Sequence, residues 1–289
     1  MLTYFIRALR PHQWTKNFLL FAGLLFSHHL LSLVLLLKVV AAFGTFCLLS
    51  GAIYIINDLV DLKNDQQHPL KRLRPIASGK IKPAVAKMLA AALLVISLLL
   101  SYWLDLKFSL VCITYAGMML SYSLYLKRIA ILDVIIIAMG FVLRAVAGAM
   151  VIAVPASPWL LVCTFFLSLF LVLAKRRHEL ILLGNNASHH RQTLSHFSPL
   201  LLDQMISVVT GATLIAYSLY TLAPRTVAQI GSSALILTIP SVIFGIFRYL
   251  HLIYEDHQGG SPEIAVISDM PLVIDVALWL MLVVTILYF

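Results

Sequence analysis

The sequence predicts an all-α integral membrane protein with about nine transmembrane helices in one bundle. Of its 289 residues, 61% are hydrophobic and 11% are charged, and the mean hydropathy is +0.97. Because about a quarter of an average soluble domain is charged, this composition excludes an ordinary soluble protein. Apolar runs of about 20 residues, the length that crosses a bilayer as a helix, recur along the whole chain.

Each of these apolar runs is a candidate transmembrane helix surrounded by membrane lipid. The first run begins after Arg7, Arg10 and Lys16 and is too long for a signal-peptide core, so we expect it to be retained. The polar loops leave no room for a separate soluble domain, so we predict one polytopic domain over residues 1–289 with a cytoplasmic cap. The candidate spans cover about residues 17–37, 39–57, 84–104, 108–126, 130–153, 158–174, 204–222, 231–250 and 271–289.

The positions of the basic residues predict the orientation of the helices. If the N-terminus is cytoplasmic, only Lys38, Lys107 and Arg225 of the 21 Lys and Arg residues fall in external loops. An excess of Lys and Arg marks cytoplasmic loops, so we expect the chemistry to face the cytosol. The net charge of +9 follows this topology rather than a soluble basic patch, which argues against nucleic acid as a partner.

Cysteine and histidine form no metal motif in this sequence. Cys47, Cys112 and Cys163 all lie inside predicted spans, where a thiol behaves as a small apolar group. The ten His residues include no His-Glu-x-x-His spacing. The sequence therefore predicts neither a disulfide framework nor a zinc site.

Acidic residues cluster where the second apolar run ends. Asp58, Asp61 and Asp65 follow this run, and on a helix they would lie within an arc of about 60°. Carboxylates crowded on one face repel one another, and a bound cation relieves the repulsion. Hard oxygen ligands beside phosphate select Mg²⁺, with Mn²⁺ as a second candidate, so we predict these three acids as metal ligands.

Basic residues follow the acids within the same loop. Lys71, Arg72 and Arg74 carry donors that bind phosphate oxygens, so the acids and bases together are typical of a diphosphate site. A plainer interpretation is also open. The acids would cap a helix and pair with Lys63 and Lys71, and the bases would only fix the topology.

Later segments also carry charge at the ends of predicted spans or inside them. Arg144 lies deep in an apolar run, where an arginine is costly unless it faces a polar cavity or pairs. Gly140 and Gly148 flank it and would also fit close helix packing. At cytoplasmic ends, basic residues either bind phosphate or simply orient the helices. The candidates there are Tyr122, Lys127, Asp133, Lys175, Arg176 and Glu179.

The acid–base segment resembles a known signature. Asn57-Asp58-x-x-Asp61-x-x-x-Asp65, followed by Lys71-Arg72-x-Arg74-Pro75-Ile76-x-Ser78-Gly79, is similar to the first signature of the UbiA superfamily of intramembrane prenyltransferases. Aromatic prenyltransferases of the superfamily have a second Asp-rich cluster, whereas this chain has only Asp133 in that region. Similarity to the members that transfer a phosphoribosyl group extends over Arg10-Pro11-x-Gln13-Trp14-x-Lys16-Asn17, residues 122–148, and Lys175-Arg176 with Glu179.

The resemblance implies a UbiA-like bundle and an Mg²⁺-dependent glycosyltransferase in a bacterial plasma (inner) membrane, with a homotrimer as a compatible assembly. The enzyme would transfer 5-phosphoribosyl from phosphoribosyl diphosphate to a polyprenyl phosphate of the decaprenyl type, for a cell-envelope polysaccharide such as an arabinan. Asp58, Asp61 and Asp133 would be catalytic. The residues implied to bind substrate are Lys16, Asn57, Lys71, Arg72, Arg74, Tyr122, Lys127, Arg144, Lys175, Arg176 and Glu179.

Two other functions fit parts of the sequence. An aromatic prenyltransferase of quinone or heme biosynthesis would use the acids to bind prenyl diphosphate, but the single Asp133 and the basic Lys175-Arg176 segment count against it. A lipid-phosphate transporter would also combine about nine spans with intramembrane charge. A transporter would not need three acids beside a phosphate-binding basic run.

Overall fold

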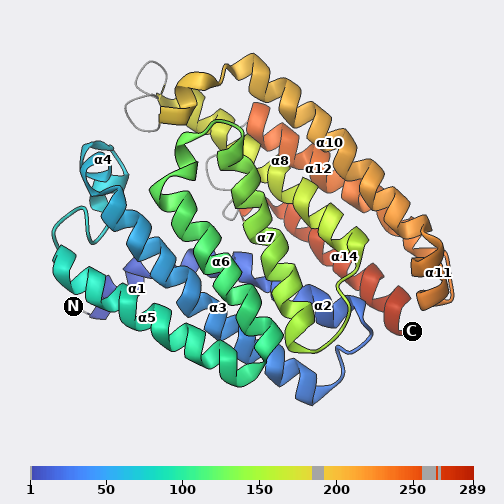
Figure 1. Cartoon of the computed structure of the whole chain (residues 1–289). Helices are drawn as coiled ribbons and strands as arrows, with labels where there is room; N and C mark the ends of the chain where they lie inside the picture. The colour runs from blue at the N-terminus through green and yellow to red at the C-terminus, as the bar shows by residue number, and fades with distance from the viewer. Residues whose placement is uncertain (1, 184–191, 256–264, 266–267) are drawn as a thin grey trace. The chain divides into compact units, whose positions relative to one another are not determined.

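Helices connected by turns and short loops make up the part of the chain that the structure describes. The computed structural model describes residues 2–183, 192–255, 265 and 268–289. Every regular element among these residues is a helix (Figure 1). Seven of the described helices are long and apolar enough to cross a membrane. The prediction of an all-α multi-pass membrane protein is thereby confirmed, and the expected number of about nine spans is approximate.

Contacts between helices divide the chain into two compact units. The first comprises residues 1–156 with 185–196, and the second comprises residues 157–184 with 197–289. The candidate residues up to Arg144 belong to the first unit. The expectation that the whole chain acts as one polytopic domain stays a prediction.

Four long helices form most of the first unit and can be followed in Figure 1: α3 (Leu33–Val60), α5 (Pro83–Leu104), α6 (Leu106–Leu124) and α7 (Leu132–Val151). α3 packs against α5 and α6, and α6 packs against α7. Aromatic rings fill the core between them. The ring centroid of Phe46 on α3 lies 4.9 Å from that of Tyr115 and 6.4 Å from that of Phe108, and all three side chains are buried.

Local sequence sets where two of these helices begin. Pro83 occupies the first turn of α5, where its missing N–H removes no helical hydrogen bond. Asp105 caps α6, because its carboxylate accepts a hydrogen bond from the backbone N–H of Phe108 at 2.8 Å. α6 covers most of the predicted span at residues 108–126, but Lys107 and its serine, threonine and tyrosine residues lower its hydropathy and it is not among the seven apolar spans.

The N-terminal segment differs from the prediction. No single helix covers residues 17–37, and the chain bends between residues 27 and 32, where His28 has a positive φ of 61°. α3 then runs past Lys38 without a break, because that side chain is exposed and needs no buried partner. The span predicted at 17–37 is therefore replaced by the 3₁₀ helix η1 (Pro11–Leu20), α2 (Phe21–Phe26) and the start of α3, with α1 (Leu2–Ala8) before them. The span predicted at 39–57 lies within α3.

The described part of the second unit is built from four longer helices and two short ones. They are α8 (Pro158–Leu183), α10 (Pro199–Leu222), α11 (Pro224–Ile230), η6 (Ala234–Thr238), α12 (Ile239–Tyr254) and α14 (Met270–Tyr288). α8 packs against α10, and α12 packs against α14. The hydroxyl of Tyr217 joins three elements, because it lies 2.7 Å from Thr238 Oγ1 and accepts a hydrogen bond from Trp279 Nε1 at 2.9 Å. The turn predicted at residues 259–263 lies outside the described residues, so the cytoplasmic cap stays a prediction.

Candidate active site

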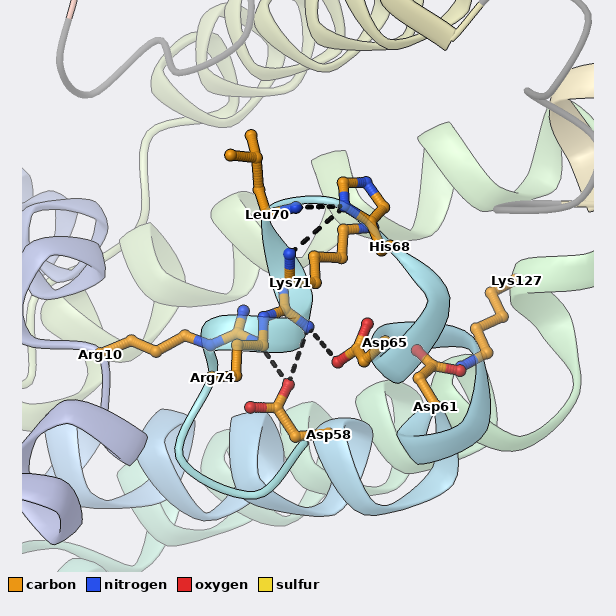
Figure 2. A network of polar contacts seen from close by, with 9 residues as sticks. All are labelled: Arg10, Asp58, Asp61, Asp65, His68, Leu70, Lys71, Arg74 and Lys127. Atoms are coloured by element: carbon orange, nitrogen blue, oxygen red, sulfur yellow. Dashed lines mark hydrogen bonds and ion pairs between the residues drawn. The ribbon is translucent and has the colours of Figure 1, made fainter. Parts of the chain in front are cut away.

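The segment after α3 folds back toward the end of that helix. It forms α4 (Leu62–Gln67) and the 3₁₀ turn η2 (Lys71–Leu73) before α5 begins. His68 shapes the turn, because its Nδ1 accepts hydrogen bonds from the backbone N–H groups of Leu70 and Lys71 at 3.1 and 3.3 Å. The turn brings basic side chains of this segment to the acids that follow the apolar part of α3 (Figure 2).

Asp58 lies at the centre of this network (Figure 2). Its side chain is only 3% exposed, and its Oδ1 accepts hydrogen bonds from the guanidinium groups of Arg10 and Arg74, the latter at 3.1 Å. The same Nη1 of Arg74 also donates to Asp65 Oδ2 at 2.6 Å, so one nitrogen links Asp58 and Asp65. These partners compensate for the high cost of burying a carboxylate charge.

Asp65, on α4, is as buried as Asp58. Burial raises the pKa of its carboxyl above the ordinary value for aspartate, and the charge of Asp58 adds to this rise. Arg74, and to a smaller extent Lys71, oppose it by favouring the ionised form. Arg74 therefore favours the ionised form of Asp65 and opposes the rise in pKa that burial causes.

Asp61 has a different partner from the other two acids. Its Oδ1 accepts a hydrogen bond from Lys127 Nζ at 2.5 Å, and Lys127 lies on η3 (Leu126–Arg128) between α6 and α7. Asp61 itself is the joint between α3 and α4, so the three acids belong to two helices rather than to the one continuous helix that was expected. Within the described residues, no three Asp, Glu, His or Cys side chains are gathered closely enough to hold a metal ion. Asp58 and Asp65 share Arg74 whereas Asp61 bonds Lys127, and metal binding by the three acids stays a prediction.

Other predicted residues of the first unit lie around the same loops. Tyr122 is 8% exposed near the end of α6, and Asp133 is fully buried in the first turn of α7, where the helix dipole favours a carboxylate. The backbone carbonyl of Asn57 accepts the N–H of Asp61 at 2.9 Å. Arg72 is exposed on η2. The bases of that segment whose charges lower the pKa of Asp65 are Arg74 and Lys71.

Arg144 is buried on α7, only 4% exposed, and its hydrogen-bond acceptors are neutral. Its Nε donates to Asn17 Oδ1, its Nη1 to the carbonyl of Gly140 and its Nη2 to the hydroxyl of Tyr115, each at 2.8 Å. Hydrogen bonds and aromatic faces together compensate for the buried charge. The rings facing the guanidinium are those of Tyr115, Phe141 and Phe46, with centroids at 4.9, 5.4 and 5.7 Å.

The 3₁₀ helix η1 is held against α3 and α7 by polar residues. Asn17, 1% exposed, donates to Cys47 Sγ at 3.3 Å and to Ser50 Oγ at 3.4 Å on α3. Lys16 Nζ lies 6.0 Å from the ring centroid of Phe141 on α7. These contacts position η1 within the first unit, and substrate binding by Lys16 stays a prediction.

Lys175, Arg176 and Glu179 lie on α8 in the second unit. Arg176 is 3% exposed, and its Nη1 donates to Glu179 Oε2 at 2.8 Å, three residues further along the helix. This ion pair therefore joins two residues of the same helix, one turn apart. Phosphate binding by these three residues stays a prediction.

Comparison with known proteins identifies the family. Residues 17–265 match the UbiA prenyltransferase family. The chain belongs to this family. The resemblance drawn from the acid–base signature is thereby confirmed.

Relatives in the UbiA family match nearly the whole chain. It is 33% identical to the decaprenyl-phosphate phosphoribosyltransferase of Mycolicibacterium smegmatis, over 95% of this chain and 89% of the relative. It is 31% identical to the protein of the same name from Corynebacterium glutamicum, over 98% and 86%. Its fold resembles a UbiA homolog from Archaeoglobus fulgidus solved with DMAPP and Mg²⁺, with a TM-score of 0.73 at 20% identity over 98% of each chain.

Arg10 is a residue of this candidate site that the sequence-based selection missed. Its guanidinium bonds Asp58 and lies 5.1 Å from the ring centroid of Tyr54, one turn earlier on α3. Its backbone is left-handed, with φ 52° and ψ 65°, directly before Pro11. The Arg-Pro pair was visible within the resembling N-terminal segment, but the separation of 48 positions between Arg10 and Asp58 concealed the contact.

Proposed function

We propose that this UbiA-family protein transfers the 5-phosphoribosyl group of phosphoribosyl diphosphate to a polyprenyl phosphate of the decaprenyl type. The products would be phosphoribosyl-phospho-polyprenol, a precursor for a cell-envelope polysaccharide, and diphosphate. Similarity over nearly the whole chain to two decaprenyl-phosphate phosphoribosyltransferases carries the proposal. The network around Asp58 supports it, because it supplies carboxylates and phosphate-binding bases in one place.

The donor chemistry of the network fits Mg²⁺. In phosphate sites this ion is usually held by one or two carboxylates together with substrate phosphates and water. Asp58 and Asp65 are two such carboxylates, bonded to one nitrogen of Arg74. We assign Asp58 and Asp65 as ligands of Mg²⁺, which Asp61 would join only after it leaves Lys127. Mn²⁺ suits the same oxygens. When bound, the ion would neutralise the diphosphate and make it a better leaving group.

The side chains of the first unit would then act through charge. The bond between ribose C1 and the diphosphate oxygen breaks, and an oxygen of the lipid phosphate forms the new bond to C1 with inverted configuration. Lys71, Arg72 and Arg74 hold the departing diphosphate. Asp133 favours the positive charge that develops on the ribose ring. The lipid phosphate is already anionic near neutral pH, so no strong base is required.

Label transfer tests this function. Purified protein in lipid vesicles receives radiolabelled phosphoribosyl diphosphate, a polyprenyl phosphate and Mg²⁺, and we expect label in chloroform-soluble material. Asp58→Asn should lower the rate about 100-fold or more, because it removes a charge placed for the metal and diphosphate. EDTA should stop the reaction, and Mg²⁺ or Mn²⁺ but not Zn²⁺ should restore it.

The same assay separates the alternatives. Lys87→Met serves as a matched control, because Lys87 is an exposed base of α5 outside the network, and it should keep the wild-type rate. Prenylation of 4-hydroxybenzoate from a prenyl diphosphate, with no labelled phosphoribosyl lipid, would overturn the phosphoribosyl assignment and leave the family unchanged. Movement of lipid phosphate across the vesicle membrane without any new lipid product would indicate a transporter.

A further inference from the structure

Asp58, Asp61 and Asp65 each have a basic partner supplied by other residues of the first unit. Two of the acids, Asp58 and Asp65, have side chains only 3% and 5% exposed, so their ion pairs lie where charge interactions are strong. Within these six side chains, three carboxylates face three cations and the charges balance. The pairs are Asp58 with Arg10 and Arg74, Asp65 with Arg74, and Asp61 with Lys127 (Figure 2).

This charge balance disfavours the binding of a divalent cation without diphosphate. It equally disfavours the binding of diphosphate without a cation. For a divalent cation to bind alone, Asp58 and Asp65 must leave their arginines, which would then stay partly buried without a counter-charge. For a diphosphate to bind alone, the arginines must leave the carboxylates, with the same penalty on the acids. When both arrive, each broken ion pair is replaced by a carboxylate–metal or guanidinium–phosphate contact.

We infer that Arg10, Arg74 and Lys127 keep the acids paired until metal and diphosphate bind together, and that Arg10 then becomes a ligand of the diphosphate. The inference rests on the proposed function, whose site it describes in more detail. Its consequence is a mutual dependence: each of the two ligands raises the affinity for the other by the same factor. Arg10 is thereby a donor-binding residue as well as the partner of Asp58.

The backbone around Arg10 is arranged to hold its side chain in this place. A left-handed conformation is uncommon for a residue other than glycine and persists where the surroundings enforce it. The N–H of Arg10 donates to the carbonyl of Arg7 at 3.2 Å, and its carbonyl accepts the N–H of Gln13 at 2.8 Å. With both backbone groups bonded, the guanidinium is directed over Tyr54 toward Asp58.

Calorimetric titration of the purified full-length protein in detergent tests the inference without relying on turnover. One titration uses MgCl₂ alone, and the other uses inorganic diphosphate in excess Mg²⁺. Arg10→Met should bind Mg²⁺ alone about tenfold more tightly, because Asp58 loses a competing cation. It should bind diphosphate in Mg²⁺ about tenfold more weakly, because one phosphate ligand is gone. Lys127→Met should shift both affinities in the same two directions.

Two control variants make the result specific. Arg10→Lys keeps a cation near Asp58 and should retain most of the weak Mg²⁺ binding of the wild type. Lys87→Met removes a positive charge from exposed α5 and should leave both titrations unchanged. Mg²⁺ and diphosphate also associate in solution, so affinities are compared between variants under identical conditions, where that contribution is the same.

The direction of the shifts decides between the inference and its alternatives. Affinities that both fall in Arg10→Met and Lys127→Met would indicate structural damage, and affinities that both stay unchanged would remove Arg10 from the site. Either outcome overturns the inference. If the wild-type protein binds no diphosphate even in Mg²⁺, the proposed function is refuted. If the wild type binds diphosphate but the Mg²⁺ and diphosphate affinities of the two variants do not shift in opposite directions, only the inference is refuted.

Discussion

Arg144 joins three elements of the first unit through one planar side chain. Its donors point in different directions, to Asn17 on η1, to the carbonyl of Gly140 and to Tyr115 on α6. A lysine ammonium cannot reach three such separated acceptors. We expect Arg144→Lys to lose about 2–4 kcal/mol of stability and to lower the apparent Tm of the purified protein by several degrees.

The Arg144→Lys measurement has a matched control in Arg128→Lys. Arg128 is exposed on η3, so the same exchange there should leave the Tm within a degree or so. An unchanged Tm in Arg144→Lys with a large loss of turnover would contradict the structural role. It would instead support the substrate-binding role that the sequence predicts for Arg144.

Asp269, just before α14 in the second unit, makes stability depend on pH. Its carboxylate accepts hydrogen bonds from Arg248 at 2.7 and 3.1 Å and caps α14 through the N–H of Leu272 at 3.0 Å. The hydrogen bonds from Arg248 are the main reason that its pKa is lowered in the folded protein. An acid with a lowered folded pKa stabilises the fold above its unfolded pKa, and the stabilisation is lost as the pH falls through the folded pKa.

Asp269→Asn should therefore unfold at a lower temperature than wild type near pH 7, and the difference should shrink as the pH falls below about 4. Asparagine keeps the helix cap, so the variant removes the charge and little else. Thermal unfolding in detergent between pH 7 and pH 3 measures the difference. A constant gap across this range would show that the charge of Asp269 does not contribute.

At the scale of elements, η1 and α7 approach each other too closely for any side chain at Gly148. A Cβ built there would lie 1.9 Å from the carbonyl oxygen of Leu20 and within 2.7 Å of its Cα. Because these atoms belong to the backbone, η1 must move as a whole. Gly148→Ala should cost about 3 kcal/mol. It should also lower turnover, since η1 begins directly after Arg10.

Gly44→Ala is the matched control for Gly148→Ala. Gly44 lies within α3, and a Cβ added there meets no atom within 4 Å. Alanine is a better helix former than glycine, so this variant should be as stable as wild type or slightly more stable. Apparent Tm and turnover of the two variants, measured side by side, check the prediction. Equal behaviour of the two would contradict the close approach of η1.

The ends of a helix could be predicted from hydropathy where the whole helix is apolar. The runs at 84–104 and 271–289 correspond to α5 and α14 within a residue or so at each end. The run at 158–174 does not, because α8 continues through charged residues to Leu183. Hydropathy measures where the membrane ends, whereas backbone hydrogen bonds decide where a helix ends.

The composition of the candidate site was predictable from spacing, but its pairing was not. Acids and bases on one short segment indicated a charged site. Which acid bonds which base depends on the fold-back after α3 and on partners far along the chain, such as Lys127 for Asp61 at a separation of 66 residues. The break at Asp61 also has no sequence signal stronger than a polar residue at a membrane boundary.

At the scale of the whole molecule, α5 offers a direct test of orientation. With 22 residues it is about 33 Å long, enough to cross the hydrocarbon core. Ser78 precedes it and Lys107 follows it, and both are exposed. The distribution of basic residues predicts a cytoplasmic Ser78 and an external Lys107. The same orientation would place the acids at the end of α3 in the cytosol, on the side where the proposed phosphosugar donor would be available.

This orientation can be measured with single cysteines, introduced one at a time into a variant from which Cys47, Cys112 and Cys163 have been removed. In intact spheroplasts, a membrane-impermeant maleimide should label Lys107→Cys at once and label Ser78→Cys only after permeabilisation. Lys107→Cys removes an external base and so leaves the cytoplasmic excess of positive charge intact. Label transfer in vesicles then identifies folded variants. Labelling of Ser78→Cys in intact spheroplasts, with Lys107→Cys protected, would invert the topology and place the candidate site outside the cell.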